Sequence, residues 1–168
     1  MIYSNIINYN KLREKIGSDL KRVLRQEKVC RETVLEIYKN VTYRMPADRA
    51  LSALLRKRKE LGSRDRRMLY DLIFSLFRWL GWTKFKPEKK DIEKCFLASL
   101  ILDWKIDHSV VNLWSIQYEL PDGWRNVLRD ESLECKYKNL SIWLDFPKSV
   151  FKKENLFPNF FFEEIFIP

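Results

Sequence analysis

Glycine, cysteine and histidine are scarce in this chain of 168 residues, which has four glycines, three cysteines and one histidine. So few glycines argue against a β-sandwich or barrel, which needs a turn about every ten residues, and against a phosphate loop built on repeated glycine. Cys30, Cys95 and Cys135 lie too far apart to suggest a disulfide framework or paired zinc ligands. We therefore expect a reduced, metal-free protein of the cytoplasm.

Long apolar runs are also missing. No stretch reaches the roughly eighteen consecutive apolar residues of a membrane span, and residues 1–15 lack the basic and apolar regions of a secretion signal. Neither membrane insertion nor export is expected. Hydrophobic residues still make up 46% of the chain, enough for the core of one ordinary domain, so disorder and several domains are both disfavoured.

Positive charge is concentrated in the first half of the chain. Residues 1–85 carry 20 Lys and Arg against 9 Asp and Glu, whereas residues 86–168 carry 12 against 14. A one-sided basic surface attracts polyanions such as nucleic acid or an anionic membrane face. The alternative is a solvated helix face without a partner.

Apolar residues recur at helical spacing through residues 1–130 and predict an all-α bundle of six or seven helices. A first stripe covers residues 10–26, with Gly17 as a possible break, and a second covers residues 28–44. Pro46 is expected to begin a third helix, which Gly62 ends, and Pro87 a fifth. Asp107 is expected to cap a sixth helix, and residues 124–128 to form a short one after the turn at residues 121–123.

The fourth helix has the clearest pattern. Ser63 is expected to cap it, and six apolar residues then follow at i, i+3, i+4, i+7, i+8 and i+11: Leu69, Leu72, Ile73, Leu76, Phe77 and Leu80. Burying them contributes on the order of 10 kcal/mol before conformational entropy is subtracted. This segment is therefore predicted to be a core helix.

Residues 131–168 differ from the bundle. Leu140, Ile142, Leu144 and Phe146 alternate with other residues and predict a short strand ended by Pro147. An irregular aromatic tail follows, in which residues 155–168 contain five phenylalanines. We expect the tail either to fold back on the bundle or to bind a partner protein.

Enzymatic groups are not apparent. Cys30 and Cys95 lie on apolar helix faces, His108 is not linked to either by any pattern, and Glu163 and Glu164 diverge because they are adjacent. The tryptophans Trp79, Trp82, Trp104 and Trp114 fit helix packing better than base stacking. Neither a catalytic residue nor a metal or cofactor ligand is assigned.

Basic residues are the candidate site instead. Arg64, Arg66 and Arg67 stand at the start of the fourth helix, where free amides favour anions. The whole predicted RNA-binding set is Arg56, Lys57, Arg58, Lys59, Arg64, Arg66, Arg67, Lys21, Arg22 and Arg25. Two structural alternatives stand beside it: cations in a last turn stabilise the helix dipole, and Arg66 or Arg67 forms an internal pair with Glu60, Asp65 or Asp71.

The segment Leu61-Gly62-Ser63-Arg64-Asp65-Arg66-Arg67, with the apolar stripe and Arg78-Trp79 after it, resembles a known domain. It is similar to the N-terminal NusB-like domain of the Sun/RsmB (NOL1/NOP2/Sun) RNA cytosine-5 methyltransferases, over about residues 28–125. The resemblance implies a NusB-like helical bundle and a role with small-subunit (16S) ribosomal RNA. In that family a second domain binds S-adenosylmethionine and carries catalytic cysteines.

Those catalytic features are not found here. None of the three cysteines has the family's Pro-Cys or Thr-Cys-Ser context, no Gly-x-Gly is present, and the chain stops near where the second domain would begin. We therefore expect residues 1–130 to be an RNA-binding domain without methyltransferase activity, followed by a junction-like segment at residues 131–168. The alternatives are a truncated methyltransferase, a NusB-like antitermination factor, and a protein-interaction scaffold.

Overall fold

The computed structural model describes residues 2–41, 45–83 and 92–145 and confirms the all-α class: this part has no β-strand. In these ranges seven α-helices lie before residue 130, in agreement with the six or seven predicted, and an eighth follows them. Their bounds are α1 Ile2–Ile16, α2 Leu20–Asn40, α3 Ala47–Lys57, α4 Ser63–Thr83, α5 Ile92–Leu102, α6 Ser109–Gln117, α7 Trp124–Arg129 and α8 Leu133–Trp143, with a 3₁₀ turn η1 at Gly17–Asp19.

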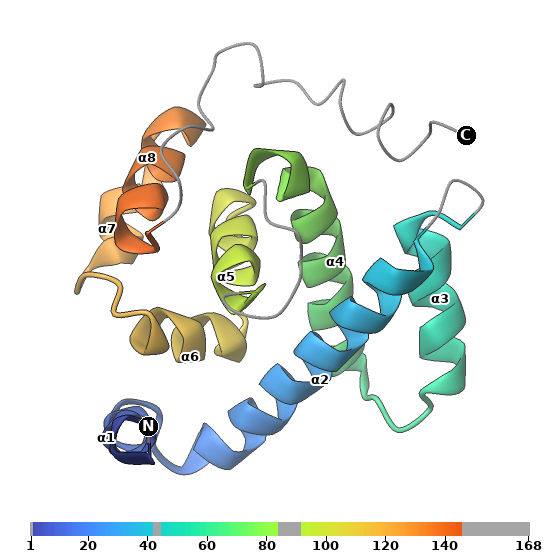
Figure 1. Ribbon diagram of the computed structural model, residues 1–168, viewed down its shortest axis with the longest axis horizontal. Coiled ribbons are helices and arrows are strands. Elements are labelled where there is room, and N and C mark those ends of the chain that lie inside the picture. The colour runs from blue at the N-terminus through green and yellow to red at the C-terminus, as the bar shows by residue number, and fades with distance from the viewer. Residues whose placement is uncertain (1, 42–44, 84–91, 146–168) are drawn as a thin grey trace.

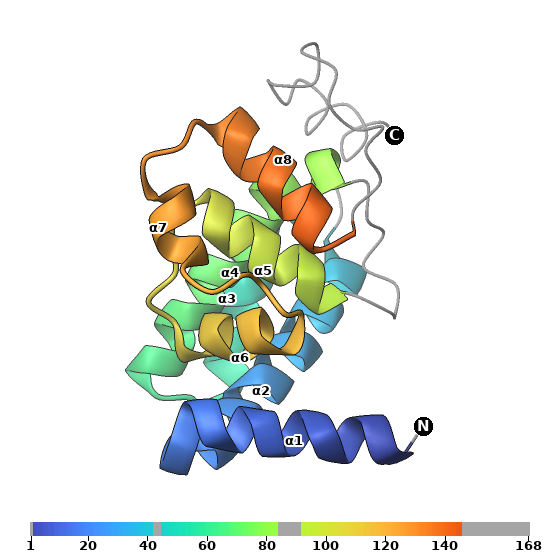
Figure 2. The same cartoon turned by 90° about the vertical axis from the view of Figure 1, so that its left-hand side faces the viewer.

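Helix α5 is the centre of the bundle (Figure 1). Every residue of this helix except Lys94 is buried, because α4, α6 and α8 all pack against it. Helix α2 runs along α3, α4 and α6, and α1 lies across one end of the bundle beside α6 (Figure 2). At the core, the rings of Phe96 on α5 and Trp114 on α6 lie 5.6 Å apart.

The stripe predicted for the fourth helix is confirmed. Leu69, Leu72, Ile73 and Leu76 are fully buried and Phe77 nearly so; the side chain of Leu80 lies outside the described part. Helix α4 starts with Ser63 itself, and the carbonyl of Gly62 accepts the first backbone hydrogen bond, 3.0 Å from the amide of Arg66. The sequence motif that predicted the core helix is therefore placed correctly to within one residue.

The first two predicted helices are divided differently. Gly17 does break the stripe: it is the first residue of η1 and has a φ of 70°. The boundary expected near residues 26–28 is wrong, because α2 continues from Leu20 to Asn40. Gln26 and Glu27 stand where the two predicted stripes meet, and both are buried although they are polar. Each has a polar partner, which removes the usual cost of burial.

Other helix starts shift by a residue or two. Pro46 is the N-cap of α3 rather than its first residue, and α3 ends at Lys57, before Gly62. His108, not Asp107, is the N-cap of α6. The expected helix start at Pro87 lies outside the described residues.

The strand predicted in the last segment is wrong. Residues 133–143 form α8, whose Ser132 hydroxyl caps the amide of Cys135 at 3.2 Å. Its apolar side chains Tyr137 and Leu140 are buried, as is Leu144 at the C-cap, at i, i+3 and i+7, whereas Ile142 is 59% exposed. Phe146, Pro147 and the phenylalanine-rich tail lie outside the described residues.

Three helices end in a left-handed residue that is not glycine. Trp104, Glu119 and Asp145 have φ of 55°, 52° and 54°. After α5 and α6 the chain closes with a Schellman pair of hydrogen bonds, for example Leu120 N to Ser115 O at 2.9 Å and Glu119 N to Ile116 O at 3.2 Å. The left-handed conformation normally favours glycine, because the Cβ of any other residue comes too close to the following carbonyl oxygen. These three helix ends are therefore strained.

The cysteines and tryptophans pack as predicted. Cys30 and Cys95 are buried, as are Trp79 and Trp114, and Trp104 is half-buried against the core; the side chain of Trp82 lies outside the described part. Within the segments given above, no helix has the length and apolarity needed to cross a bilayer.

Candidate nucleic-acid interface

A groove of about 520 Å³ lies where the start of α4 meets α2 and the loop from α5 to α6. Four cations line it, namely Arg22, Arg64, Arg67 and Lys105, against two carboxylates, Asp71 and Asp107. The remaining lining residues are Gln26, Met68, Trp104, His108 and Ser109. Three of the predicted RNA-binding arginines are thus brought together from two helices.

Arg64 and Arg67 lie in the first two turns of α4 and are exposed. Neither has a hydrogen bond or ion pair with any residue that the structure describes. Unpaired guanidinium groups beside the free amides of a helix start favour an anion. Both arginines are therefore available for a ligand.

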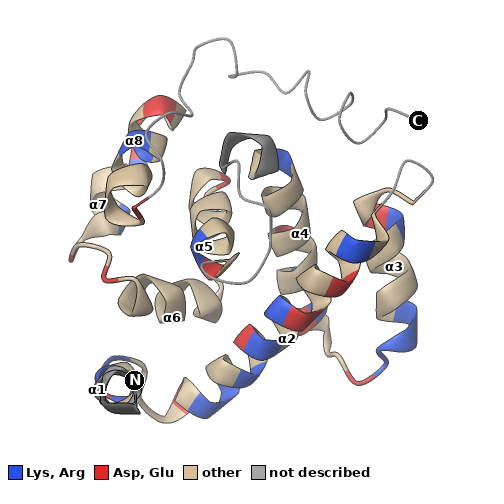
Figure 3. Ribbon diagram, viewed as in Figure 1, with Lys and Arg blue, Asp and Glu red and all other residues tan. Residues whose placement is uncertain are grey.

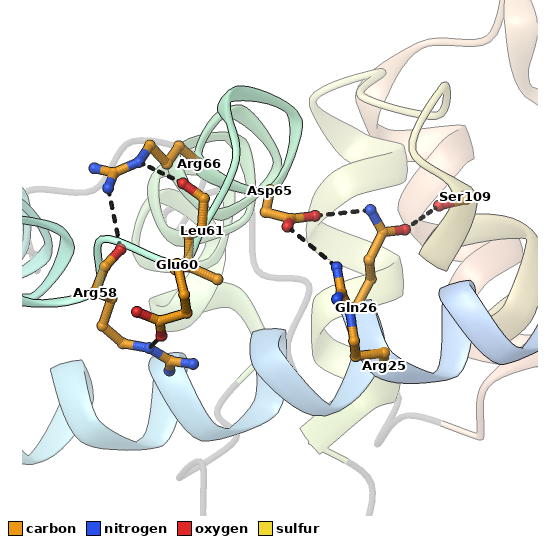
Figure 4. Close-up of polar contacts among 8 residues, drawn as sticks. All are labelled: Arg25, Gln26, Arg58, Glu60, Leu61, Asp65, Arg66 and Ser109. Atoms are coloured by element: carbon orange, nitrogen blue, oxygen red, sulfur yellow. Dashed lines mark hydrogen bonds and ion pairs between the residues drawn. The ribbon is translucent and has the colours of Figure 1, made fainter.

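The start of α4 is held in place by a polar chain through Gln26 (Figure 4). The side-chain amide of Gln26 donates to Asp65 at 2.8 Å, and its oxygen accepts from the hydroxyl of Ser109 at 2.7 Å. Arg25 also lies 3.8 Å from Asp65. This contact between α2, α4 and α6 fixes the floor of the groove.

The far wall of the groove is built by Asp71. Its carboxylate lies 2.9 Å from Nε2 of His108 and 3.5 Å from Nζ of Lys105. The left-handed turn at Trp104 ends α5 and brings Lys105 back toward α4. Sequence reasoning did not assign Lys105 or His108 to the site, because their partner is more than thirty positions away and no local pattern predicts the contact.

Arg66 has an internal role. It donates to the carbonyls of Leu61 and Arg58 at 2.9 and 3.0 Å, so it closes the turn between α3 and α4 (Figure 4). An internal interaction was expected for Arg66 or Arg67, but the acceptors are main-chain oxygens rather than a carboxylate. Arg66 is thus tied to the fold and does not line the groove.

The basic run from Arg56 to Lys59 lies on that same turn, away from the groove. Arg56 and Lys57 occupy the last turn of α3, where cations suit the dipole, and Arg58 pairs with Glu60 at 2.7 Å. The arginine beside it lowers the pKa of Glu60. The lining of the groove includes none of these four residues.

The predicted cations of α2 are only partly in the groove. Lys and Arg recur along this helix (Figure 3), but only Arg22 lines the groove, where it pairs with Asp19 at 2.9 Å. That hydrogen bond from Arg22 lowers the pKa of Asp19. Lys21 is exposed, and Arg25 faces Asp65.

A larger hollow of about 780 Å³ separates α1 from the turn between α6 and α7. Four cations and three carboxylates line it, and two ion pairs cross it: Lys11 with Glu119 at 2.7 Å and Lys15 with Asp122 at 3.8 Å. Every cation of this hollow has a polar partner, since Arg22 pairs with Asp19 and Arg125 bonds to Asn112. The groove differs in that Arg64 and Arg67 are unpaired, so the hollow is the weaker anion site.

Chemistry other than binding has little support in this region. Among the residues that the structure describes, no three His, Cys, Asp or Glu side chains gather to hold a metal ion. Burial raises the pKa of the Cys30 thiol, which disfavours the thiolate that a nucleophile needs. Cys135 is exposed on α8.

Glu27 and Glu93 are buried together on α2 and α5, bridged by Arg31. Arg31 bonds to Glu27 and lies 3.2 Å from Glu93, which also accepts from Tyr118 at 3.2 Å. Burial raises the pKa of Glu27 more than the nearby guanidinium lowers it. The three charges link two helices and have no access to the groove lining, so we assign them to the fold.

No family model, curated protein or solved structure matches this chain.

Proposed function

We propose that this chain is an RNA-binding helical domain, related to the NusB-like domain that its sequence resembles, and that ribosomal RNA is its substrate class. One observation carries the proposal: Arg64 and Arg67 stand unpaired beside Arg22 and Lys105 in one open groove. Such a cluster neutralises phosphates, which supply most of the affinity of nucleic-acid binding. The excess of positive charge in residues 1–85 adds long-range attraction.

The groove suits a phosphate chain better than a small catalytic substrate. It combines four cations and the start of a helix, and its lining contains no cysteine. Phosphate contacts give affinity and position but do not read the base sequence. We therefore infer that the domain positions RNA and does not itself transfer a methyl group, and that S-adenosylmethionine is not its ligand.

The test is the salt dependence of RNA binding by the intact chain. If the four cations each contact a phosphate, the slope of log affinity against log salt should be about −3. A fourfold rise in salt should then weaken binding by roughly fiftyfold. Replacing both Arg64 and Arg67 by glutamine should flatten the slope by about 1.4. The affinity for unrelated RNA sequences should fall by the same factor.

Arg129 and Lys138 provide the matched control. They are exposed cations on α7 and α8, outside the groove. Arg129→Gln with Lys138→Gln removes the same charge and should change RNA affinity little. A larger loss in this control pair, or absence of binding at low salt, contradicts the proposal and favours the protein-interaction alternative. A ribosomal-protein partner in a pull-down would instead favour the antitermination alternative.

A further inference from the structure

Two aromatic side chains of α4 face solvent although this helix contributes much of the core. Tyr70 is 38% exposed and Phe74 46%, whereas Phe77 and Trp79 on the same helix are buried. The Tyr70 and Phe74 rings are nearly parallel, with 11° between their planes and 6.1 Å between their centroids. They form one aromatic patch, which we call the α4 platform.

The α4 platform continues from the groove. Arg67, Tyr70 and Phe74 follow at i, i+3 and i+7, the spacing that puts side chains on one face of a helix. Arg67 lines the groove, so the first ring lies one helical turn beyond a groove cation. Beyond the platform on the same face, Arg78 is held by Asp103 at 2.9 Å. The exposed rings therefore lie between the unpaired Arg67 and the ion-paired Arg78.

The cations beside the α4 platform indicate which kind of ligand would bind there. A protein partner with an apolar surface has no need of an arginine-lined groove beside the rings, whereas a nucleic acid presents phosphates and flat bases together. Aromatic rings stack on any base, and single-stranded binding proteins combine such rings with a basic groove. In duplex RNA the base faces are already stacked inside the helix.

We propose that Tyr70 and Phe74 stack on the bases of single-stranded RNA whose phosphates lie in the groove. The proposal rests on the proposed RNA-binding function and adds that the RNA recognised is an unpaired segment. Stacking is tolerant of base identity, so the α4 platform favours single strands over duplexes without selecting a sequence.

The experiment compares three probes by fluorescence anisotropy: an oligoadenylate of about twelve nucleotides, a duplex of equal length, and an abasic strand with the same phosphates. The wild type should bind the oligoadenylate most tightly. Phe74→Leu should weaken that binding roughly tenfold, since one stacking ring is lost, while leaving the abasic strand and the salt slope unchanged. Phe74→Trp should retain the affinity because it retains a stacking surface.

Tyr9→Leu is the matched control, since Tyr9 is an exposed aromatic residue on α1, which packs on α6 and α2. Circular dichroism and a urea midpoint for each variant check the fold. The stacking proposal is contradicted if the wild type binds the oligoadenylate and the abasic strand equally tightly, or if Tyr9→Leu loses as much affinity as Phe74→Leu. Either result leaves the proposed RNA binding in place. Absence of binding to all three probes at low salt overturns the proposed function, and the platform with it.

Discussion

Single polar side chains join helices where apolar packing alone would not fix their register. Asp103, in the turn after α5, accepts from Ser75, Arg78 and Trp79 of α4 at 2.8, 2.9 and 2.7 Å. Gln26 on α2 likewise joins two other helices, because it bonds to Asp65 on α4 and to Ser109 on α6. A buried polar group without a partner is costly, so these bonds favour one arrangement of the helices over others.

Tyr137 shows how burial couples stability to pH. Burial raises its pKa to about 12, from 10.0. The neutral phenol is thus favoured in the folded chain, so its contribution is complete below pH 10 and is lost as the pH rises through about 12. We expect the stability difference between wild type and Tyr137→Phe to shift against wild type by about 1.4 kcal/mol per pH unit in that window.

Urea unfolding of both proteins at pH 9 and at pH 11 measures this shift. The difference between the two proteins cancels the titration of lysines and of the other tyrosines. An unchanged difference between the two pH values would show that the phenol ionises normally in the fold.

Helix α4 could be predicted from sequence, because its stripe is both apolar and regular and all its described members are buried. Helix α8 could not, since exposed Ile142 lies between buried Leu140 and Leu144 and produces a false alternation. The continuity of α2 was also hidden, because Gln26 is buried through partners on α4 and α6 that no local pattern indicates. Glu27 is buried too, with Arg31 four residues along the same helix as its partner. The periodicity thus failed where a polar residue is buried or an apolar residue is exposed.

The candidate site was predictable to a similar extent. Arg22, Arg64 and Arg67 were expected from the clusters of charge, and the groove brings them together. Lys105 and His108 were not expected, because they join the groove only through Asp71 of a distant helix. Arg66 was expected in the same set but does not line the groove, and no sequence feature shows that its donors point to main-chain carbonyls.

Leu72→Ala and Leu76→Ala test the assignment of α4 as the core helix. Both side chains are fully buried. Each truncation should lower the free energy of unfolding by roughly 2–5 kcal/mol through lost burial and a residual cavity. Arg67→Gln, an exposed change on the same helix, should alter it by no more than about 0.5 kcal/mol. Urea midpoints for Leu72→Ala equal to wild type would show that the inner face is assigned wrongly.

Across the chain as a whole, positive charge and apolar packing occupy different parts of the sequence. The helices up to α4 supply three of the four groove cations, whereas α5 contributes an almost wholly buried surface. The later helices therefore hold α4 in place while the earlier ones provide the charges. The proposed binding function would therefore depend on the earlier helices for its charges and on the later ones for their support.

Methyl transfer tests the inference that the domain positions RNA without modifying it. With S-adenosylmethionine and ribosomal RNA, this chain should incorporate no labelled methyl group, because Cys30 and Cys95 are buried and the pKa of Cys30 is raised. Calorimetry should detect no binding of the cofactor. Methyl transfer that disappears on changing any one of the three cysteines to serine would contradict this expectation.

The three left-handed helix ends leave the chain open to simple stabilisation, although not equally. Asp145→Gly relieves a Cβ clash at an exposed position and should raise the free energy of unfolding by up to about 1 kcal/mol, measurable in urea. Glu119→Gly should gain less, because it loses the contact with Lys11. Trp104→Gly should destabilise, since that ring packs against the core under Lys136, 4.6 Å from the ring centre. The backbone strain can therefore be removed at Asp145, where the helix end only closes a turn. It is retained at Trp104, because that side chain both packs on the core and lines the groove.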